Sequence, residues 1–226
     1  MTSYFVTASG TGVGKTHVTA RLTRELMARG KTVKVVKPLI TGFTWHGLKH
    51  TDTGILLHHL GLDPTPENVK AISPWRFDEP VSPDMAARHE GRDIDFDEVI
   101  AFSRDAMDGP EDVALIEGVG GVMVPMDDTH TVADWIAALD IPTIVVVGTY
   151  LGTLSHTLTT IEAMRGRGLA IEAVVVSESE DSPVPLEETA ETIERFLPDM
   201  DVRRLERAKY DSSQPDILAD IALAAG

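Results

Sequence analysis

The chain has 226 residues, no cysteine, and 36 acidic against 20 basic residues, which leaves a formal net charge of −16. This length suits a single large α/β domain, and the charge argues against nucleic acids and acidic membranes as partners, because both would be repelled. The lack of cysteine excludes disulfides, iron–sulfur ligation and thiol nucleophiles. A strand pattern begins almost at residue 1 and no apolar run has the length of a membrane span, so we expect a soluble cytoplasmic protein.

The N-terminal segment has the layout of a phosphate-binding loop. A short apolar strand at Tyr4–Val6 leads into the glycine-rich stretch Ala8–Gly14, which Lys15 and Thr16 follow directly. Glycines let successive backbone N–H groups wrap a phosphate, the lysine can reach the terminal phosphates, and the threonine hydroxyl can ligate magnesium. The helix that comes next is expected to place four apolar residues on one face: Val18, Leu22, Leu26 and Met27.

This loop is a variant of the strict pattern, which has glycine where this chain has Ser9. A glycine-rich turn with a chance Lys-Thr pair is the alternative, but the flanking strand and helix fit the phosphate loop. A dinucleotide fingerprint fits less well, because the spacing is G-x-G-x-G and a lysine follows at once. We therefore expect the nucleotide on the loop residues Thr11, Gly12, Val13, Gly14, Lys15 and Thr16.

Strand and helix patterns alternate through the rest of the chain. The first helix should end near Arg29-Gly30. Further strands are expected near residues 32–37, 113–117, 143–147, 171–176 and 202–205, and helices near 52–60, 85–89, 96–107, 132–139, 153–164, 186–196 and 217–225. We interpret Leu39–Gly42 as a loop and the proline-rich stretch 64–83 as an excursion over the sheet. The alternation predicts one α/β domain over residues 1–226, with a P-loop NTPase-like, mostly parallel sheet covered by helices on both faces.

Polar residues follow two of the predicted strands. Lys37 and Thr41 come after the second strand, and Glu117 ends a buried strand just before the turn Gly118–Gly121. Open α/β sheets bind ligands at the carboxyl ends of their strands. An acid in this position can serve magnesium, although an exposed turn acid would show the same pattern. The phosphate loop favours the magnesium interpretation.

Several segments together resemble the dethiobiotin synthetase family, in its order and spacing. They are the variant loop Thr7–Thr16, Lys37–Gly42 (K-P-x-x-[ST]-G), Asp52, Phe77–Pro83 (F-x-x-P-x-S-P), Ile116–Gly121 (E-G-A-G-G) and Leu151–His156 (L-G-x-[IL]-N-H). The resemblance implies an ATP-dependent ligase that uses magnesium. Such an enzyme carboxylates one amine of 7,8-diaminononanoate with CO2, phosphorylates the carbamate, and closes a cyclic urea to give dethiobiotin, ADP and phosphate.

The resemblance also implies roles for individual residues. Lys15 and Lys37 would be catalytic, and Thr16, Asp52 and Glu117 would hold magnesium. Glu117 and Ser177 would also contact the nucleotide, while Thr41 and Gly118 would contact the substrate. The substrate carboxylate would lie on a helix start from the partner subunit of a homodimer, formed by Gly152, Thr153, Leu154 and Ser155.

Some positions depart from the family pattern and leave the base preference open. Ser177 stands where the family has an adenine-reading Asn, Ser155 replaces an Asn, and Asp84 replaces a common His. The family's G-x-I-P-like segment is absent, and Arg203 or Arg204 is a candidate nucleotide contact.

Three other functions compete with the synthetase. A partitioning-type nucleotide-switch ATPase would carry a signature lysine where this chain has Gly10. A glutamine-dependent amidoligase needs a nucleophilic cysteine and a longer chain. A non-catalytic nucleotide-binding subunit is separated from the synthetase only by an activity assay.

Overall fold

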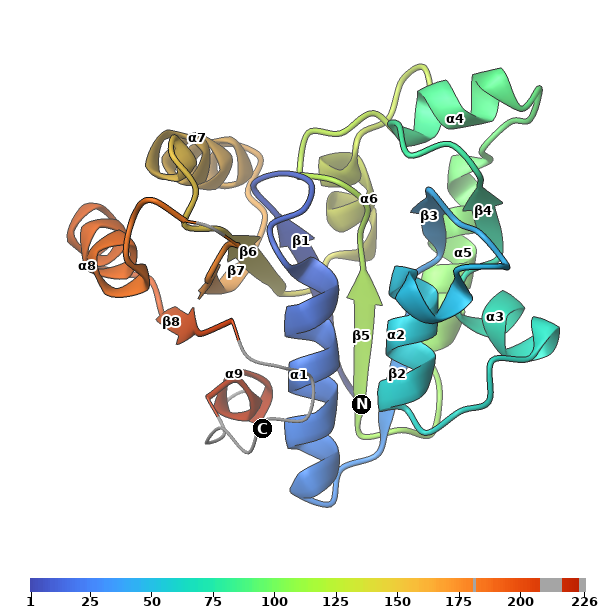
Figure 1. The fold of residues 1–226 in the computed structure, drawn as a ribbon, viewed down its shortest axis with the longest axis horizontal. Coiled ribbons are helices and arrows are strands. Elements are labelled where there is room, and N and C mark those ends of the chain that lie inside the picture. Colours follow the sequence, from blue (N-terminus) through green and yellow to red (C-terminus); the bar gives the residue numbers. More distant parts are fainter. Residues whose placement is uncertain (181, 208–216, 224–226) are drawn as a thin grey trace.

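Six parallel strands form the main sheet of this computed structural model, which describes residues 1–180, 182–207 and 217–223 (Figure 1). Their spatial order is β2 (Val33–Val36), β5 (Val113–Glu117), β1 (Thr2–Ala8), β6 (Thr143–Val147), β7 (Ile171–Ser177) and β8 (Val202–Leu205). The predicted parallel P-loop NTPase-like sheet is confirmed. Strand β1 lies inside it, between β5 and β6, and therefore delivers the glycine loop to the middle of the carboxyl edge.

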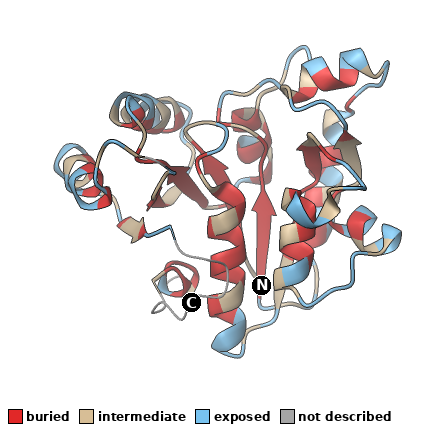
Figure 2. Cartoon of the chain, in the orientation of Figure 1, coloured by how far each residue is buried: buried red, intermediate tan, exposed pale blue. Residues whose placement is uncertain are grey.

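Helices cover both faces of the sheet because successive strand residues point to opposite sides. Tyr4 and Val6 pack into one core, whereas Phe5 packs into another. The first face is covered by α1 (Lys15–Ala28), α2 (Asp52–His59), α3 (Pro66–Ile72) and α9 (Ala219–Leu223). The other is covered by α4 (Pro83–His89), α5 (Phe96–Met107), α6 (Val132–Leu139), α7 (Thr153–Gly166) and α8 (Leu186–Phe196). Figure 2 shows the strands buried between these layers.

Two expectations about the excursion after β2 are wrong. The stretch expected as a loop contains β3 (Leu39–Thr41), which pairs in parallel with β4 (Trp75–Phe77) in a separate two-stranded sheet. Strands of three residues are too short to show periodicity. Helix α3 was also missed, although Thr65 caps it by accepting from the Asn68 N–H and Pro66 begins it. The short η1 turn (Leu48–His50) precedes α2.

The first helix ends as predicted, at Ala28 with Gly30 in the left-handed region at φ 78°. Met27, however, is 44% exposed and does not share the buried face of Leu26. The helix is buried along most of its length, but residues 27–30 are all exposed, so the buried part of α1 ends at Leu26. The predicted last helix is confirmed over 219–223, and its expected residues 224–225 lie outside the described part. No helix within the described residues has the length and apolarity to cross a bilayer.

Helix α9 is anchored to α1 by one buried carboxylate. Glu25, which is 1% exposed, accepts hydrogen bonds at Oε2 from the backbone N–H groups of Ile217, Leu218 and Ala219 (2.7–3.1 Å). Its Oε1 pairs with the buried Arg21 at 2.5 Å. The first N–H groups of a helix have no partner inside the helix, so this carboxylate satisfies them from another element.

We therefore predict that Glu25→Ala lowers the free energy of unfolding by about 3 kcal/mol, because it leaves buried donors without their carboxylate. Glu25→Gln should cost about half as much, since its amide oxygen still accepts. Urea unfolding measures both changes, with Glu191→Ala on the exposed face of α8 as the control. Equal stability of Glu25→Ala and the control would contradict the anchoring role.

Candidate active site

The register of the sheet brings the predicted polar residues together. Val6 of β1 lies opposite Glu117 of β5, and Val36 of β2 lies opposite Ile116. The residue after Val36 is Lys37, which is therefore set beside Glu117 at the carboxyl edge. The glycine loop that follows β1 reaches the same place.

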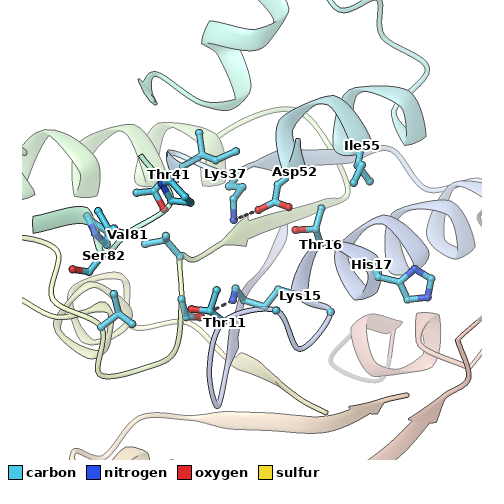
Figure 3. Close-up of a pocket in the computed structure, with 18 residues that line it drawn as sticks. Thr11, Lys15, Thr16, His17, Lys37, Thr41, Asp52, Ile55, Val81 and Ser82 are labelled. Carbon is cyan, nitrogen blue, oxygen red and sulfur yellow. Dashed lines mark hydrogen bonds and ion pairs between the residues drawn. The ribbon is translucent and has the colours of Figure 1, made fainter. Parts of the chain in front are cut away.

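A cavity of about 710 Å³ opens at this edge (Figure 3). The phosphate loop and the start of α1 form one side of it, and the segment after β2 forms another. Eight of the predicted site residues line it: Thr11, Gly12, Gly14, Lys15, Thr16, Lys37, Thr41 and Asp52, the last at the start of α2. The structure thus brings most of the predicted nucleotide and metal residues, and Thr41 of the substrate residues, into one cavity. Glu117 and Gly118 do not line it but contact Lys37.

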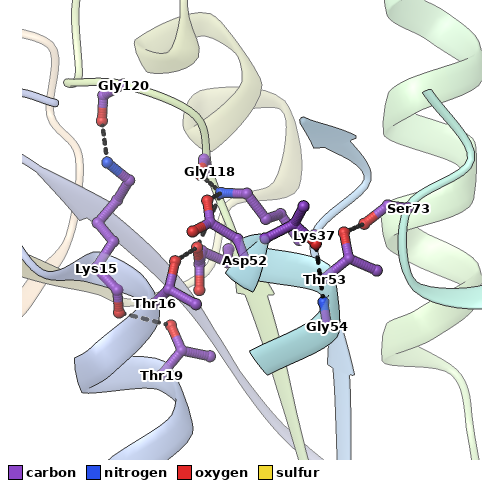
Figure 4. Close-up of polar contacts among 12 residues, drawn as sticks. Lys15, Thr16, Thr19, Lys37, Asp52, Thr53, Gly54, Ser73, Gly118 and Gly120 are labelled. Atoms are coloured by element: carbon purple, nitrogen blue, oxygen red, sulfur yellow. Dashed lines mark hydrogen bonds and ion pairs between the residues drawn. The ribbon is translucent and has the colours of Figure 1, made fainter. Parts of the chain in front are cut away.

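Lys37 is buried to 2% exposure and held by three oxygen atoms (Figure 4). Its Nζ lies 2.8 Å from Glu117 Oε1, 3.1 Å from Asp52 Oδ2 and 3.0 Å from the Gly118 carbonyl. Burial lowers the pKa of this amine, but the charges of Glu117 and Asp52 outweigh burial and raise its pKa above the ordinary value. Lys37 is therefore a fixed positive charge at the cavity wall.

Asp52 reaches Lys37 because the first turn of α2 is capped and packs closely against the preceding η1 turn. The Thr51 hydroxyl accepts from the Gly54 N–H and caps the helix. A Cβ on Gly54 would lie 1.9 Å from the Leu48 carbonyl oxygen, so only glycine permits this approach. Although burial raises the pKa of Asp52, the charge of Lys37 outweighs that effect and holds the pKa below its usual range.

Glu117 is fully buried and has one carboxylate oxygen to spare. Its Oε1 accepts from the Thr16 hydroxyl at 2.6 Å as well as from Lys37. Its Oε2 has no hydrogen-bond partner among the described residues. A buried carboxylate oxygen beside a threonine hydroxyl and a second carboxylate fits magnesium, which takes one or two carboxylates and keeps several waters. The alternative of an exposed turn acid is excluded by the burial.

Lys15 extends across the glycine loop toward the turn after β5. Its Nζ donates to the carbonyl oxygens of Gly120 at 2.6 Å and of Gly10 at 3.4 Å. Burial and the nearby charge of Lys37 lower the pKa of Lys15 to about 8. The phosphate loop and the turn after β5 approach each other closely at their backbones. A Cβ on Gly121 would lie only 3.1 Å from the Gly10 nitrogen.

A second cavity, of about 180 Å³, lies on the other side of the phosphate loop. Gly12, Gly14 and His17 line both cavities. Val13, Ser177, Glu178, Ser179 and Arg207 complete the second one. A Cβ on Gly14 would lie 2.6 Å from the Ser177 hydroxyl, so β7 ends against the loop itself.

Neither predicted arginine lines these two cavities. Arg203 pairs with Asp201 at 2.8 Å, and Arg204 pairs with Glu187 and Glu194 at 2.8 Å each. Arg207 lines the second cavity instead. Sequence reasoning missed Arg207 because it lies beyond the last predicted strand, in a segment without periodicity.

The predicted helix start Gly152–Ser155 lines neither cavity of its own chain. Helix α7 begins there after Gly152, without a hydrogen bond from a capping side chain. The preceding Leu151 is 82% exposed. These residues are therefore not part of the cavity that the other predicted residues line.

An apolar wall faces the phosphate loop across the first cavity, and sequence reasoning named none of its residues as functional. Ile40, Val81, Val119 and Val124 contribute side chains to this wall. Its only sequence signal was position, since each lies within or just beyond a motif that carries the polar residues. His17 was likewise missed, although it directly follows Thr16.

Known proteins share this sequence and this fold. A family model described as an AAA domain matches residues 2–207. The ATP-dependent dethiobiotin synthetase BioD of Acidiphilium cryptum (strain JF-5) is 48% identical over 87% of this chain and 89% of its own. The same-named protein of Methylobacterium nodulans is 42% identical over 86% and 89%.

Among solved structures, a ParA family ATPase from Chlorobium tepidum aligns with a TM-score of 0.51 over 92% of this chain and 84% of its own. At 14% identity this likeness shows the fold alone. The sequence relatives are far closer and match nearly full length. The chain therefore belongs to the ATP-dependent dethiobiotin synthetase family.

Proposed function

We propose that this protein is a cytoplasmic ligase that converts 7,8-diaminononanoate, CO2 and ATP into dethiobiotin, ADP and phosphate. One amine takes up CO2 as a carbamate, and a carbamate oxygen attacks the γ-phosphorus of ATP as ADP leaves. The second amine then attacks the carbamate carbon, phosphate departs, and the cyclic urea closes. A carbamate is a poor electrophile because its charge is delocalised, and phosphorylation gives it a leaving group.

The observation that carries this proposal is the pair of lysines in one cavity with the phosphate loop. The reaction must hold two anions together, the carbamate and the γ-phosphate, and neutralise both. Lys37 is a buried cation on one wall, and Lys15 lies on the glycine loop opposite. We assign Lys15 to the phosphates and Lys37 to the carbamate and the transferring phosphoryl group.

Magnesium would be held by Thr16, Asp52 and Glu117, directly or through water. The unpartnered Oε2 of Glu117 supports this assignment. The ion would supply positive charge to the phosphates. No dedicated protein base stands out among the site residues described above, and positioning and charge neutralisation are the main contributions expected of the chain to the phosphoryl transfer.

The remaining contacts follow from the two cavities. Backbone groups of Thr11 and Gly12 would line the reacting end, and Thr41 and Gly118 would contact the diamine. The apolar wall suits the aliphatic chain of that substrate. The nucleoside would occupy the second cavity and lie against Ser177. Val13 and Gly14 of the phosphate loop would also line the nucleoside site.

The direct test mixes the pure protein with magnesium-ATP, bicarbonate and 7,8-diaminononanoate. Phosphate release should depend on the diamine, and mass spectrometry should detect one dethiobiotin for each phosphate. Diamine-independent hydrolysis, or none, would overturn the synthetase and favour a nucleotide switch or a non-catalytic subunit.

We predict that Lys37→Gln lowers kcat by at least about 100-fold while ADP affinity changes by less than about threefold. The amide can still donate to Glu117 and Gly118, so the substitution removes mainly the charge. Single-turnover kinetics and calorimetric ADP binding measure the two effects. Lys34→Gln, within the strand that Lys37 follows, is the control. Equal loss of turnover and ADP binding in folded Lys37→Gln would contradict this role.

A homodimer with shared sites would give the start of α7 a ligand. Its N–H groups lack a capping side chain and suit a carboxylate, yet they line neither described cavity of their own chain. The exposed Leu151 beside them provides apolar contact area for a second copy. We assign the Gly152–Ser155 segment to the substrate carboxylate in the partner's site.

Leu151→Asp should therefore weaken the dimer by at least about tenfold, because it removes the burial of a leucine in each copy. Sedimentation velocity measures the dimer, and turnover should fall with it while ADP binding persists. Phe196 is also an exposed apolar residue, at the end of α8, and Phe196→Asp should change neither the dimer affinity nor turnover. A monomeric parent protein, or an unchanged dimer in Leu151→Asp, would contradict the shared site.

A further inference from the structure

The loops that follow β6 and β7 are joined by a reciprocal pair of hydrogen bonds. The Thr149 N–H donates to Ser179 Oγ at 3.0 Å, and the Ser179 N–H donates to Thr149 Oγ1 at 3.0 Å. Each hydroxyl oxygen thus satisfies the backbone of the other residue. Ser182 Oγ adds a third bond by donating to the Thr149 carbonyl. We call the pair Thr149 and Ser179 the loop clamp.

The surroundings of the loop clamp are closely fitted. Thr149 is fully buried. A Cβ on Gly148 would lie 2.6 Å from Ser179 Oγ, so the residue before Thr149 must lack a side chain for the loops to meet. The Thr153 hydroxyl donates to the Gly148 carbonyl at 2.7 Å and continues the same connection into α7.

The loop after β7 is also the wall of the second cavity. Ser177, Glu178 and Ser179 line it in succession. On the far side, the Glu178 N–H donates to Leu205 O at 2.9 Å and its carboxylate accepts the Arg207 N–H at 2.8 Å. The wall is therefore tied to β8 on one side. On the other side, beyond the last β6–β7 pair at Val147 and Val176, the loop clamp and Ser182 tie it to the loop after β6.

We propose that Thr149 and Ser179 are positioning residues that set the shape of the nucleoside cavity. This inference rests on the proposed function in one respect, that the second cavity receives the nucleoside of ATP. Neither side chain needs to touch the nucleotide. The loop clamp holds the cavity wall at a fixed distance from the phosphate loop. If the clamp were broken, nucleoside affinity would fall, while the phosphate loop would still bind phosphate.

The test compares Thr149→Val, Ser179→Ala and the double variant by calorimetric binding of ADP with magnesium. Each single variant should weaken ADP by about tenfold, because one buried N–H loses its acceptor. The double variant should be no weaker than the worse single variant, since both break one unit. Thr149→Ser keeps the hydroxyl and should bind ADP like the parent.

Two controls separate positioning from general packing. Thr157→Val makes the same change at a fully buried threonine whose hydroxyl has no partner among the described residues, and it should leave ADP binding unchanged. Pyrophosphate, used as the second ligand, has no nucleoside to enter the second cavity, so its affinity should not change in Thr149→Val. All variants are compared well below their unfolding temperatures.

Different failures have different meanings. If the parent binds no ADP, the nucleoside assignment falls together with the proposed function. If the parent binds ADP and folded Thr149→Val binds it equally well, only the loop clamp is overturned. Equal weakening by Thr157→Val, or no rescue in Thr149→Ser, would also overturn it.

Discussion

The ion pair between Lys37 and Glu117 is the constraint on which the site depends. Both side chains are almost completely removed from water. Burying two charges is costly unless they are paired and their remaining hydrogen-bonding positions are used. The Gly118 carbonyl, Asp52 and Thr16 fill most of those positions, so the carboxyl ends of β1, β2 and β5 and the starts of α1 and α2 must meet at one point. The register of the sheet is what allows this.

The phosphate loop is closely approached on both sides, at glycines where a Cβ would not fit without a shift of its neighbour. On the β5 side Gly121 lies against the backbone of Gly10, and on the β7 side Gly14 lies against the Ser177 side chain. Helix α1 then begins at Lys15 with Gly14 in the left-handed region at φ 100°. The loop is thus pre-shaped in the protein itself. Its two sides face separate cavities, as the proposed placement of the phosphates and the nucleoside requires.

The sequence alone allowed prediction of those parts of the site that follow regular strands. Glu117 and Lys37 end strands with clear apolar patterns, and parallel strands end at one edge, so their meeting could be expected. The turn chemistry of Gly10–Thr16 is equally local. The pairing of Lys37 with both carboxylates depends on the register, which no local pattern reveals.

The parts that could not be predicted depend on contacts between short or irregular segments. Strands β3 and β4 have three residues each and exist because they pair with one another. Thr149 and Ser179 are 30 residues apart and carry no motif, and Arg207 follows the last strand. Met27 was expected in the core because the apolar pattern does not show that the packing on α1 ends at Leu26. The roles of the individual site residues stay predictions.

The charge balance of the site explains why lysines alone do not suffice for the proposed reaction. Two ammonium groups, Lys15 and Lys37, and two carboxylates, Asp52 and Glu117, cancel to a net charge of zero. A triphosphate and a carbamate would therefore enter a site without excess positive charge, in a chain whose net charge is −16. Backbone N–H groups and the α1 N-terminus supply only partial charges. A divalent cation on the free oxygen of Glu117 would supply the rest, and it would leave Lys37 paired with Oε1 of the same carboxylate. Glu117 can thus bind the metal with Oε2 while its Oε1 stays paired with Lys37.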